Sequence, residues 1–224
     1  MKLRQASLLI LIVLIADQAI KYYIKTNYTL NEHHNIFGSW GQLYFIENSG
    51  MAWGWQFGGS TGKIVLTLFR LVAACFGVYY IRKLVMQKQH WGFITCVSLI
   101  FAGAVGNLID SLFYGLIFTE SSDYTNTLAT LVKPGQGYGS FMHGKVVDMF
   151  YFPIFHGTWP SWLPFVGGDK FEFFSPVFNL ADASISVGVI TILFCQGLFF
   201  HRPAKRQPTT IETNTTVNDN SQMG

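Results

Sequence analysis

Four long apolar stretches divide this chain and limit the folds that it can adopt. Each is about 17–20 residues long, which is the length that a helix needs to cross the hydrocarbon core of a bilayer. A helix also satisfies its own backbone hydrogen bonds inside that core. The sequence therefore predicts an all-α membrane protein with four transmembrane helices, at about residues 6–24, 64–81, 93–112 and 183–200.

The composition agrees with a membrane setting, because 50% of the residues are hydrophobic and only 12% are charged. Soluble domains carry about 25% charged residues. The first apolar stretch follows Lys2 and Arg4 as a secretory signal would, but no convincing small-residue cleavage site comes after it. We therefore expect a retained first helix. The small positive net charge lies in the flanks of the spans, and we expect no nucleic-acid partner.

Basic residues gather on one side of the predicted spans. They precede the first span, separate the second from the third and follow the fourth: Lys2, Arg4, Arg82, Lys83, Lys88, Arg202, Lys205 and Arg206. The positive-inside rule places this side, with both termini, in the cytoplasm. The loops 25–63 and 113–182 then face outward.

The two outer loops are rich in aromatic residues. Residues 36–57 alternate aromatic residues with glycines, which predicts a small β-sheet at the outer interface. The second loop is long, with a polar half and then an aromatic half, 150–178, in which prolines prevent a long helix. This interfacial loop either anchors in the headgroup layer or contacts a substrate. Residues 1–202 form one membrane domain, and 203–224 a disordered cytoplasmic tail.

Two aspartates lie at the edges of apolar segments on the predicted outer side, and the topology places them at the outer ends of the third and fourth spans. Ionisable groups at membrane depth are costly, so Asp148 and Asp182 are functional candidates. Each could instead be structural: Asp148 could cap a helix or pair with Lys145, and Asp182 would complement a helix dipole. Two carboxyls at hydrogen-bonding distance would share one proton. Such a pair can activate water and polarise a carbonyl, which is peptide hydrolysis without a covalent intermediate.

Other polar residues interrupt the spans near the same depth. Asp17 and Lys21 have the spacing of an ion pair on one helix face. Gly103, Asn107 and Asp110 share a face of the third span. The glycine favours close helix packing, but the buried polar groups require partners.

Three observations leave alternatives open or exclude a class of site. Asn48 either forms a tight turn or offers its amide to a substrate backbone. Arg70, inside the second span, either snorkels, pairs with a carboxylate or faces the bundle interior. The outer histidines lack the spacing of a zinc protease, so we expect no metal; they are His33, His34, His143 and His156.

Taken in chain order, these segments resemble the lipoprotein signal peptidase family, also called signal peptidase II. The likeness covers residues 6–201, apart from two insertions. Five short motifs carry it: Asp17-Gln-x-x-Lys21, Asn48-x-Gly50-x-Ala52, Gly106-Asn107-x-x-Asp110, Val146-Val147-Asp148 and Asn179-x-Ala181-Asp182.

The resemblance implies an aspartic endopeptidase of the bacterial inner membrane. It would remove signal peptides from prolipoproteins, cleaving just before the lipid-modified cysteine at the outer side. Its partners would be a signal peptide with diacylglyceryl-cysteine and membrane lipids, and it would act as a monomer without a cofactor. The catalytic pair would be Asp148 and Asp182. Supporting or substrate-binding roles would belong to Asp17, Lys21, Asn48, Gly50, Asn107, Asp110, Asn179 and Ala181.

Two departures from the family pattern stand out. The family usually has arginine directly after the aspartate of its Gly-Asn-x-x-Asp motif, whereas this chain has Ser111, and Arg70 or Lys145 are candidates to replace it. Insertions at about 116–142 and 153–175 also lengthen the second outer loop. They could form a lid, a lipid-contacting element or a partner site.

Two functions from other classes remain as alternatives. A small proton-coupled transporter could use the same carboxylates as a relay, although transporters usually show two related halves. A non-catalytic lipid-binding membrane protein would tolerate loss of the carboxylates but not of the aromatic loop.

Overall fold

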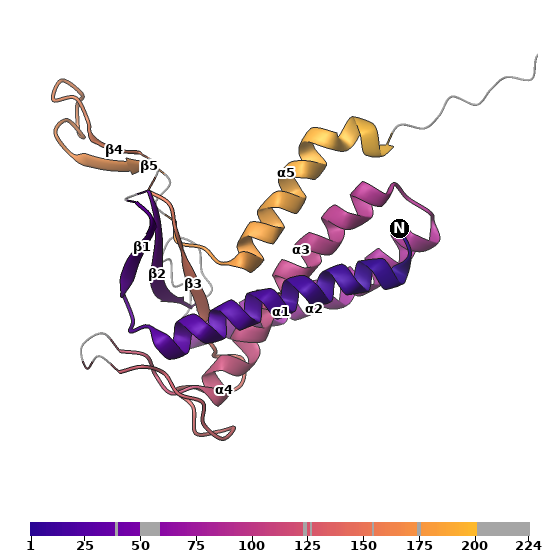
Figure 1. The fold of residues 1–224 in the computed structure, drawn as a ribbon, viewed down its shortest axis with the longest axis horizontal. Helices are drawn as coiled ribbons and strands as arrows, with labels where there is room; N and C mark the ends of the chain where they lie inside the picture. Colours follow the sequence, from indigo (N-terminus) through magenta and orange to yellow (C-terminus); the bar gives the residue numbers. More distant parts are fainter. Residues whose placement is uncertain are drawn as a thin grey trace, which may run out of the picture.

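Four long helices and a small antiparallel sheet make up this protein (Figure 1). The computed structural model describes residues 1–38, 40–49, 59–122, 125, 127–153, 155–173 and 176–200. The predicted fold class is confirmed, since the four long helices are apolar enough to cross a membrane. The helices are α1 (Leu3–Asn27), α2 (Gly59–Met86), α3 (Trp91–Ile109) and α5 (Leu180–Phe200), with a short α4 (Gly115–Ile117).

Three of the long helices extend beyond the apolar stretch that predicts them, and the stretch 93–112 is covered by α3 together with the π-helical turn that follows it. The second begins at Gly59 and ends at Met86, whereas its apolar stretch covers only 64–81. Hydropathy marks the part of a helix that meets hydrocarbon. Polar turns that continue the helix into the headgroup region therefore escape a hydropathy pattern.

The helix α3 is the centre of the bundle. It packs against α1, α2 and α5, and 56% of its apolar window is buried, against 11–17% in the other three. Small residues allow the closest approach: a side chain at Gly103 would collide with the carbonyl of Ala181 in α5, and Gly106 lies against Asp17 of α1. The glycine face of this span is therefore a packing face, as its spacing indicates.

A π-helical turn, Asp110–Tyr114, ends α3 on the side of the sheet. Wider turns of this kind often occur at functional sites. The returning chain supplies donors to its carbonyls, since the backbone N–H of Gly144 donates to Ser111 O at 3.0 Å. A side chain at Gly144 would collide with the carbonyl of Asp110. The residues that follow the first insertion thus pack closely against this turn and hydrogen-bond to it.

The three-stranded sheet lies at the end of the helices opposite to the N-terminus (Figure 1). Its order is β1 (His33–Phe37), β2 (Gly41–Asn48) and β3 (Val146–Tyr151), all antiparallel. The sequence predicts a sheet from residues 36–57, of which 39 and 50–57 lie outside the described residues. The third strand was not predicted, because Val146 to Met149 are all buried and show no alternation.

A second hairpin projects away from the helices (Figure 1). Its strands are β4 (Phe155–Thr158) and β5 (Lys170–Phe173), paired antiparallel within the second insertion. The sequence analysis expected an irregular interfacial loop here. The prolines fall outside both strands, so they bound the hairpin instead of breaking it. The first insertion is an irregular loop with isolated bridges between Phe118 and Leu131 and between Ser122 and Thr127.

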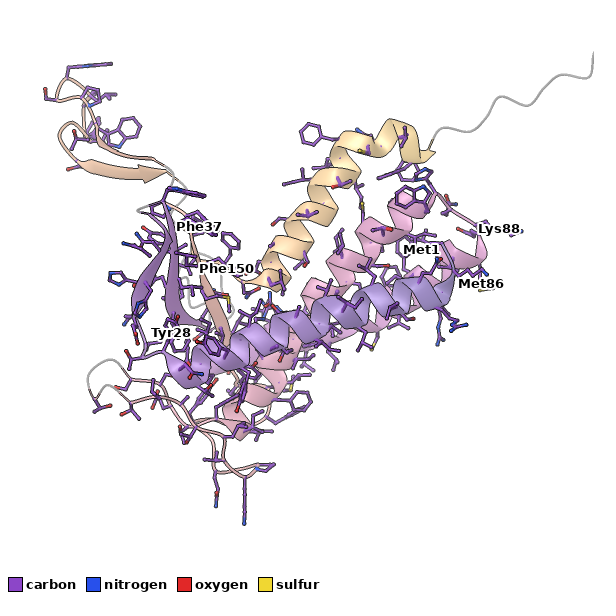
Figure 2. All side chains as sticks on the ribbon, viewed as in Figure 1. Met1, Tyr28, Phe37, Met86, Lys88 and Phe150 are labelled. Carbon is purple, nitrogen blue, oxygen red and sulfur yellow. The ribbon has the colours of Figure 1, made fainter. Side chains whose placement is uncertain are left out.

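The two ends of the helix bundle differ in the residues that they carry. Met1, Met86 and Lys88 mark one end in Figure 2, whereas Tyr28, Phe37 and Phe150 mark the end with the sheet. Buried polar side chains concentrate towards the sheet end of the spans: Asp17, Lys21, Lys25, Asn107, Asp110, Ser111, Asp148 and Asn179.

Candidate functional site

Asp148 lies within strand β3, and Asp182 lies in the first turn of α5. The sequence analysis expected Asp148 at the outer end of the third span; this is wrong, because the chain leaves α3, makes the first insertion and returns as a strand. The segment before α5 pairs with that strand. Phe150 N–H donates to Phe178 O at 2.7 Å, and Phe178 N–H donates back to Phe150 O at 3.0 Å. This pairing sets the start of α5 beside Asp148.

Asn179 caps α5 and fixes the position of Asp182. The backbone N–H of Asp182 donates to Asn179 Oδ1 at 2.9 Å, and the N–H of Asn179 points back to Asp182 Oδ2 at 3.4 Å. This reciprocal arrangement is a capping box. The helix dipole also favours a negative charge there. Asp182 therefore has the structural role that its position allows, and the other oxygen of its carboxyl has further contacts.

Two buried asparagine amides join the two aspartates. Asn107 Nδ2 donates to Asp182 Oδ1 at 2.7 Å, and Asn179 Nδ2 donates to Asp148 Oδ1 at 2.7 Å. Asn179 Nδ2 also lies 3.1 Å from Asn107 Oδ1. Asp148 is 3% exposed, whereas Asp182 is only partly buried. The carboxyl pair is thus held from α3 and α5, with Asp182 the more open to solvent.

Asn48 reaches the same carboxyl from the neighbouring strand. Asp148 is opposite Ile46 in the β2–β3 register, so Asn48, two residues on, shares its face of the sheet. The side chain of Asn48 hydrogen-bonds Asp148. Asn48 is therefore the last residue of a strand and lies at the carboxyl pair. Gly50 and Ala52 of the same motif lie outside the described residues.

The pKa of Asp148 is raised to about 7. Burial is the largest cause, because it disfavours the ionised form, and the negative charge of Asp182 adds to it. Hydrogen bonds from Asn179 and Asn48 and the charge of Lys21 oppose the increase. A carboxyl with this pKa carries its proton over much of the neutral range.

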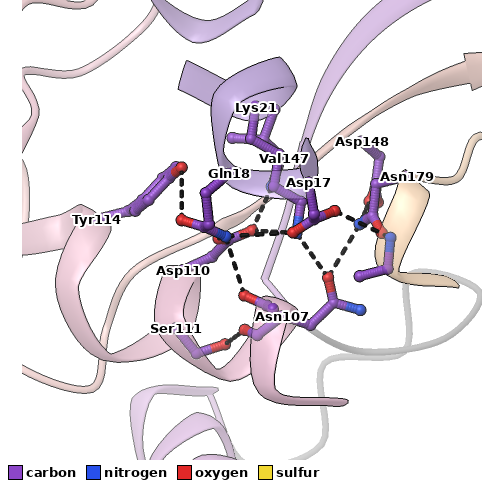
Figure 3. A network of polar contacts seen from close by, with 12 residues as sticks. Asp17, Gln18, Lys21, Asn107, Asp110, Ser111, Tyr114, Val147, Asp148 and Asn179 are labelled. Carbon is purple, nitrogen blue, oxygen red and sulfur yellow. Dashed lines mark hydrogen bonds and ion pairs between the residues drawn. The ribbon is translucent and has the colours of Figure 1, made fainter. Parts of the chain in front are cut away.

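A buried lysine of α1 forms the second layer of this network (Figure 3). Lys21 Nζ lies 3.0 Å from Asp17, 2.8 Å from Asp110 and 2.8 Å from Asn107 Oδ1. Lys21 and Asp110 are fully buried, and Asp17 is 1% exposed. Charges removed from water to this extent require excellent pairing. Asn107 thus connects the buried ion pairs to Asp182.

The network also fixes the helix backbones. Ala181 N–H donates to Asp17 Oδ1 at 2.9 Å, which ties the first turn of α5 to α1. Val147 N–H points to Asp110 Oδ2 at 3.4 Å, which ties β3 to α3. The structure thus brings together every residue of the predicted site that lies in the described ranges.

Arg70 faces the bundle interior. This half-buried residue of α2 points its Nη1 at Ser111 Oγ, 3.3 Å away. Its charge interacts with the carboxyls of three aspartates of the network, Asp182, Asp110 and Asp148. Lys145, the other candidate for the missing arginine, lies instead 3.3 Å from Glu47 and 3.5 Å from Glu120.

The sequence analysis included Gln18 in a motif of the first span but assigned it no role at the site. Gln18 donates to Asp110 Oδ1 at 2.8 Å and accepts from the hydroxyl of Tyr114 at 3.2 Å. Its position as a polar residue inside an apolar span was the signal that could have identified it.

It also missed a second buried lysine. Lys25 is fully buried and forms an ion pair with Glu47, and Ser121 of the first insertion donates to Glu47 at 3.0 Å. From sequence alone, Lys25 at the end of a span looks like an interfacial flank. In the described ranges, no group of three His, Cys, Asp or Glu residues is placed to hold a metal ion.

Comparison with known proteins gives consistent results. A family model described as signal peptidase (SPase) II matches residues 9–199. A lipoprotein signal peptidase of Porphyromonas gingivalis is 48% identical over 188 residues, covering 84% of this chain and 80% of that protein. A lipoprotein signal peptidase of Amoebophilus asiaticus is 32% identical over 212 residues, covering 92% and 83%.

Two solved bacterial membrane enzymes have a similar fold. One aligns with a TM-score of 0.56 at 24% identity, over 92% of this chain and 96% of its own. The other aligns with a TM-score of 0.53 at 27% identity, over 87% and 93%.

Proposed function

Because this chain belongs to the signal peptidase II family, we propose that Asp148 and Asp182 are the catalytic pair with which it removes signal peptides from prolipoproteins. Family membership sets aside the transporter and the non-catalytic lipid-binding protein. The observation that carries the assignment is the pair itself: Asn179 contacts both carboxyl groups, and Asn107 contacts one of them and Asn179.

Each aspartate has its own part in the proposed reaction. Asp148, with its raised pKa, holds the shared proton and donates it to the carbonyl oxygen of the scissile bond. Asp182, ionised at a helix N-terminus and partly exposed, takes a proton from water. The water oxygen bonds to the carbonyl carbon and gives a tetrahedral diol.

Breakdown of the diol completes the cycle. The C–N bond breaks, and the proton that Asp182 took from water passes to the leaving amine. The proton that Asp148 gave returns to Asp148 from one hydroxyl of the diol, which leaves the new C-terminus as a carboxylic acid that ionises after release. The pair then again holds one proton, and no bond between enzyme and peptide forms at any step.

The substrate would be a signal peptide whose next residue is diacylglyceryl-cysteine, so the leaving amine belongs to that cysteine. The carboxyl pair lies at the sheet end of the spans, where acyl chains can stay in lipid while the peptide bond reaches the polar site. The basic flanks of the opposite end support cytoplasmic termini and an active site on the outer side of the inner membrane. One chain supplies all these contacts, which supports action as a monomer.

The β4–β5 hairpin is where we expect further contact with lipid. Its tip exposes Trp162 to 79% and Phe165 to 102%. Backbone hydrogen bonds from Leu163 to Pro160 and from Gly167 to Leu163 hold the tip in shape. Tryptophan and other aromatic residues favour the headgroup layer. This supports the anchoring alternative for the second insertion.

Cleavage of a purified diacylglyceryl prolipoprotein in detergent tests this function. The proposal expects one cut, located by mass spectrometry directly before the lipidated cysteine. The matched control is the same precursor without its lipid, which should be cleaved much more slowly. Equal rates for the two precursors, or a cut elsewhere, would refute the proposed substrate.

A further inference from the structure

Arg70 is a cation at membrane depth that the proposed chemistry does not use. Its helix α2 exposes most of its apolar residues, with only 11% of its apolar window buried. Arg70 is nevertheless half-buried and contacts α3 through Ser111. An arginine that snorkels would direct its charge to the membrane surface. This one directs its charge inward, so a role within the bundle is required to explain it.

Ser111 connects Arg70 to the carboxyl pair. Its hydroxyl is 2% exposed, donates to the carbonyl oxygen of Asn107 at 2.9 Å and therefore accepts from Arg70. Asn107 in turn donates its side-chain amide to Asp182. A path of three hydrogen bonds and one residue's backbone thus joins the guanidinium to the carboxylate that takes the proton from water.

The charges around the pair are unequal. The charged and titratable groups around the pair and Arg70 come from five elements: Asp17 and Lys21 of α1, Lys63 and Arg70 of α2, Asp110 of α3, Asp148 of β3 and Asp182 of α5. Lys63 belongs to this set through its interaction with Arg70. Four carboxyls with one shared proton carry three negative charges. Lys21 is already paired with both Asp17 and Asp110. Of the carboxylates whose charge acts on Arg70, which are Asp182, Asp110 and Asp148, that of Asp182 acts most strongly.

We propose that Arg70 is a positioning residue of the reaction, whose guanidinium balances the ionised carboxyl of the pair and, through Ser111, holds Asn107 against Asp182. The proposal rests on the assignment of Asp148 and Asp182. The positive charge that stabilises the singly protonated pair then comes from α2, next to the position where α3 has a serine. A nearby cation favours ionised carboxyls, so its loss must raise the pH at which the pair gives up its proton.

The test measures kcat/KM as a function of pH in the native protein and four variants. The quantity compared is the midpoint, which is the pH at which kcat/KM has fallen to half of its maximum on the alkaline side. Arg70→Gln should move this midpoint to higher pH by about one unit and lower kcat at the optimum by at least about 10-fold. Arg70→Lys keeps the charge and should keep the native midpoint. Arg82→Gln, an exposed arginine at the other end of the same helix, is the matched control and should behave as the native protein does.

Relocation of the charge gives the sharpest variant. Arg70→Gln combined with Ser111→Arg places a guanidinium on α3 beside Asn107 and should return the midpoint towards the native value. If Arg70→Gln alone does not fold, this double variant and Arg70→Lys still decide the matter. An unchanged midpoint in Arg70→Gln, an equal shift in Arg70→Lys, or no recovery in the double variant would overturn the proposal.

A second readout separates this proposal from the proposed function. Infrared spectroscopy follows the protonated-carboxyl band of the pair, assigned by its loss in Asp148→Asn, without any cleavage. Absence of cleavage by the native protein at every pH would overturn the function. The infrared midpoint would still test Arg70, and it should move to higher pH in Arg70→Gln.

Discussion

Two buried lysines lie one turn apart on α1, and they hold different parts of the protein. Both are fully buried. Lys21 pairs with Asp17 and Asp110, which we call the inner cluster; Lys25 pairs with Glu47 and contacts Ser121, which we call the outer cluster. The two have the same chemistry of a lysine among oxygens, but their partners come from different elements.

The partners show what each cluster does. The inner cluster lies among three spans and touches Asn107, so its charges reach the carboxyl pair. The outer cluster ties α1 to β2 and to the first insertion, through Glu47 and Ser121. Glu47 is opposite Val147 in the sheet register, one residue before Asp148. We therefore propose that similar buried ion pairs support the reaction in one place and the assembly of the sheet in the other.

Loss of the inner lysine should have the largest effect. Lys21→Met leaves Asp17 and Asp110 buried without their cation, and breaking a buried pair in this way costs about 3–5 kcal/mol. We expect cleavage to fall by at least about 100-fold, which corresponds to about 2.7 kcal/mol, together with a loss of thermal stability. Rates and melting temperatures of the purified variant in one detergent measure both effects. Native-like cleavage would contradict the link from Lys21 to the pair.

The outer cluster should behave differently when one or both partners are removed. Lys25→Met should lower the free energy of unfolding by about 3 kcal/mol, because Glu47 then loses its buried cation and keeps only Ser121 and the partly exposed Lys145. The double change with Glu47→Met should recover at least about 1 kcal/mol, since an apolar pair can replace an ion pair. Denaturation of Lys25→Met, Glu47→Met and the double variant measures the coupling between the two side chains. Any folded variant should retain kcat within about 3-fold of native, equivalent to about 0.7 kcal/mol; a larger loss would place Lys25 in the reaction.

The pH dependence of cleavage should depend on the carboxyl pair and not on the outer cluster. The pKa of Asp148 is raised to about 7, and the proposed reaction needs its proton. Cleavage should therefore fall as the pH rises through about 7, approaching a tenfold decrease per pH unit once the proton is lost. The Lys25→Met/Glu47→Met protein should show the same profile. A rate that rises through this range would reverse the assignment of Asp148 as the acid.

The hairpin tip should have the smallest effect. Trp162→Ser and Phe165→Ser each remove an aromatic side chain that we expect to contact lipid, far from either lysine cluster. Each change should weaken membrane contact by about 1 kcal/mol, which would raise the apparent KM about 5-fold. We expect kcat to stay unchanged with saturating lipidated substrate in liposomes. Thr158→Ala, in the same hairpin, is the control. An unchanged KM in both tip variants would argue against contact with lipid.

The comparison of the two lysines also shows what the sequence could predict. Lys21 was identifiable because it stands within an apolar span, four residues after Asp17 and in a motif. Lys25 was not, because a basic residue at a span end has an ordinary interfacial explanation. Its burial depends on Glu47 and Ser121, which are distant in sequence and meet it only through the sheet and the first insertion.

Similar reasons separate the other successes from the failures. Polar residues at membrane depth stand out in a chain of apolar helices, so Asp148, Asp182, Asn107 and Asn179 were found without a fold. Strand β3 was missed because it is buried along Val146 to Met149 and lacks the period of a half-exposed strand. The inward direction of Arg70 was undecided because the side of a helix that faces its neighbours depends on packing.

The most direct measurement is cleavage of a diacylglyceryl prolipoprotein by the native protein, Asp148→Asn and Asp182→Asn, with the melting temperature of each recorded in the same samples. The account predicts cleavage by the native protein only, while both variants remain folded. Full activity in either folded variant would contradict the assignment of the carboxyl pair.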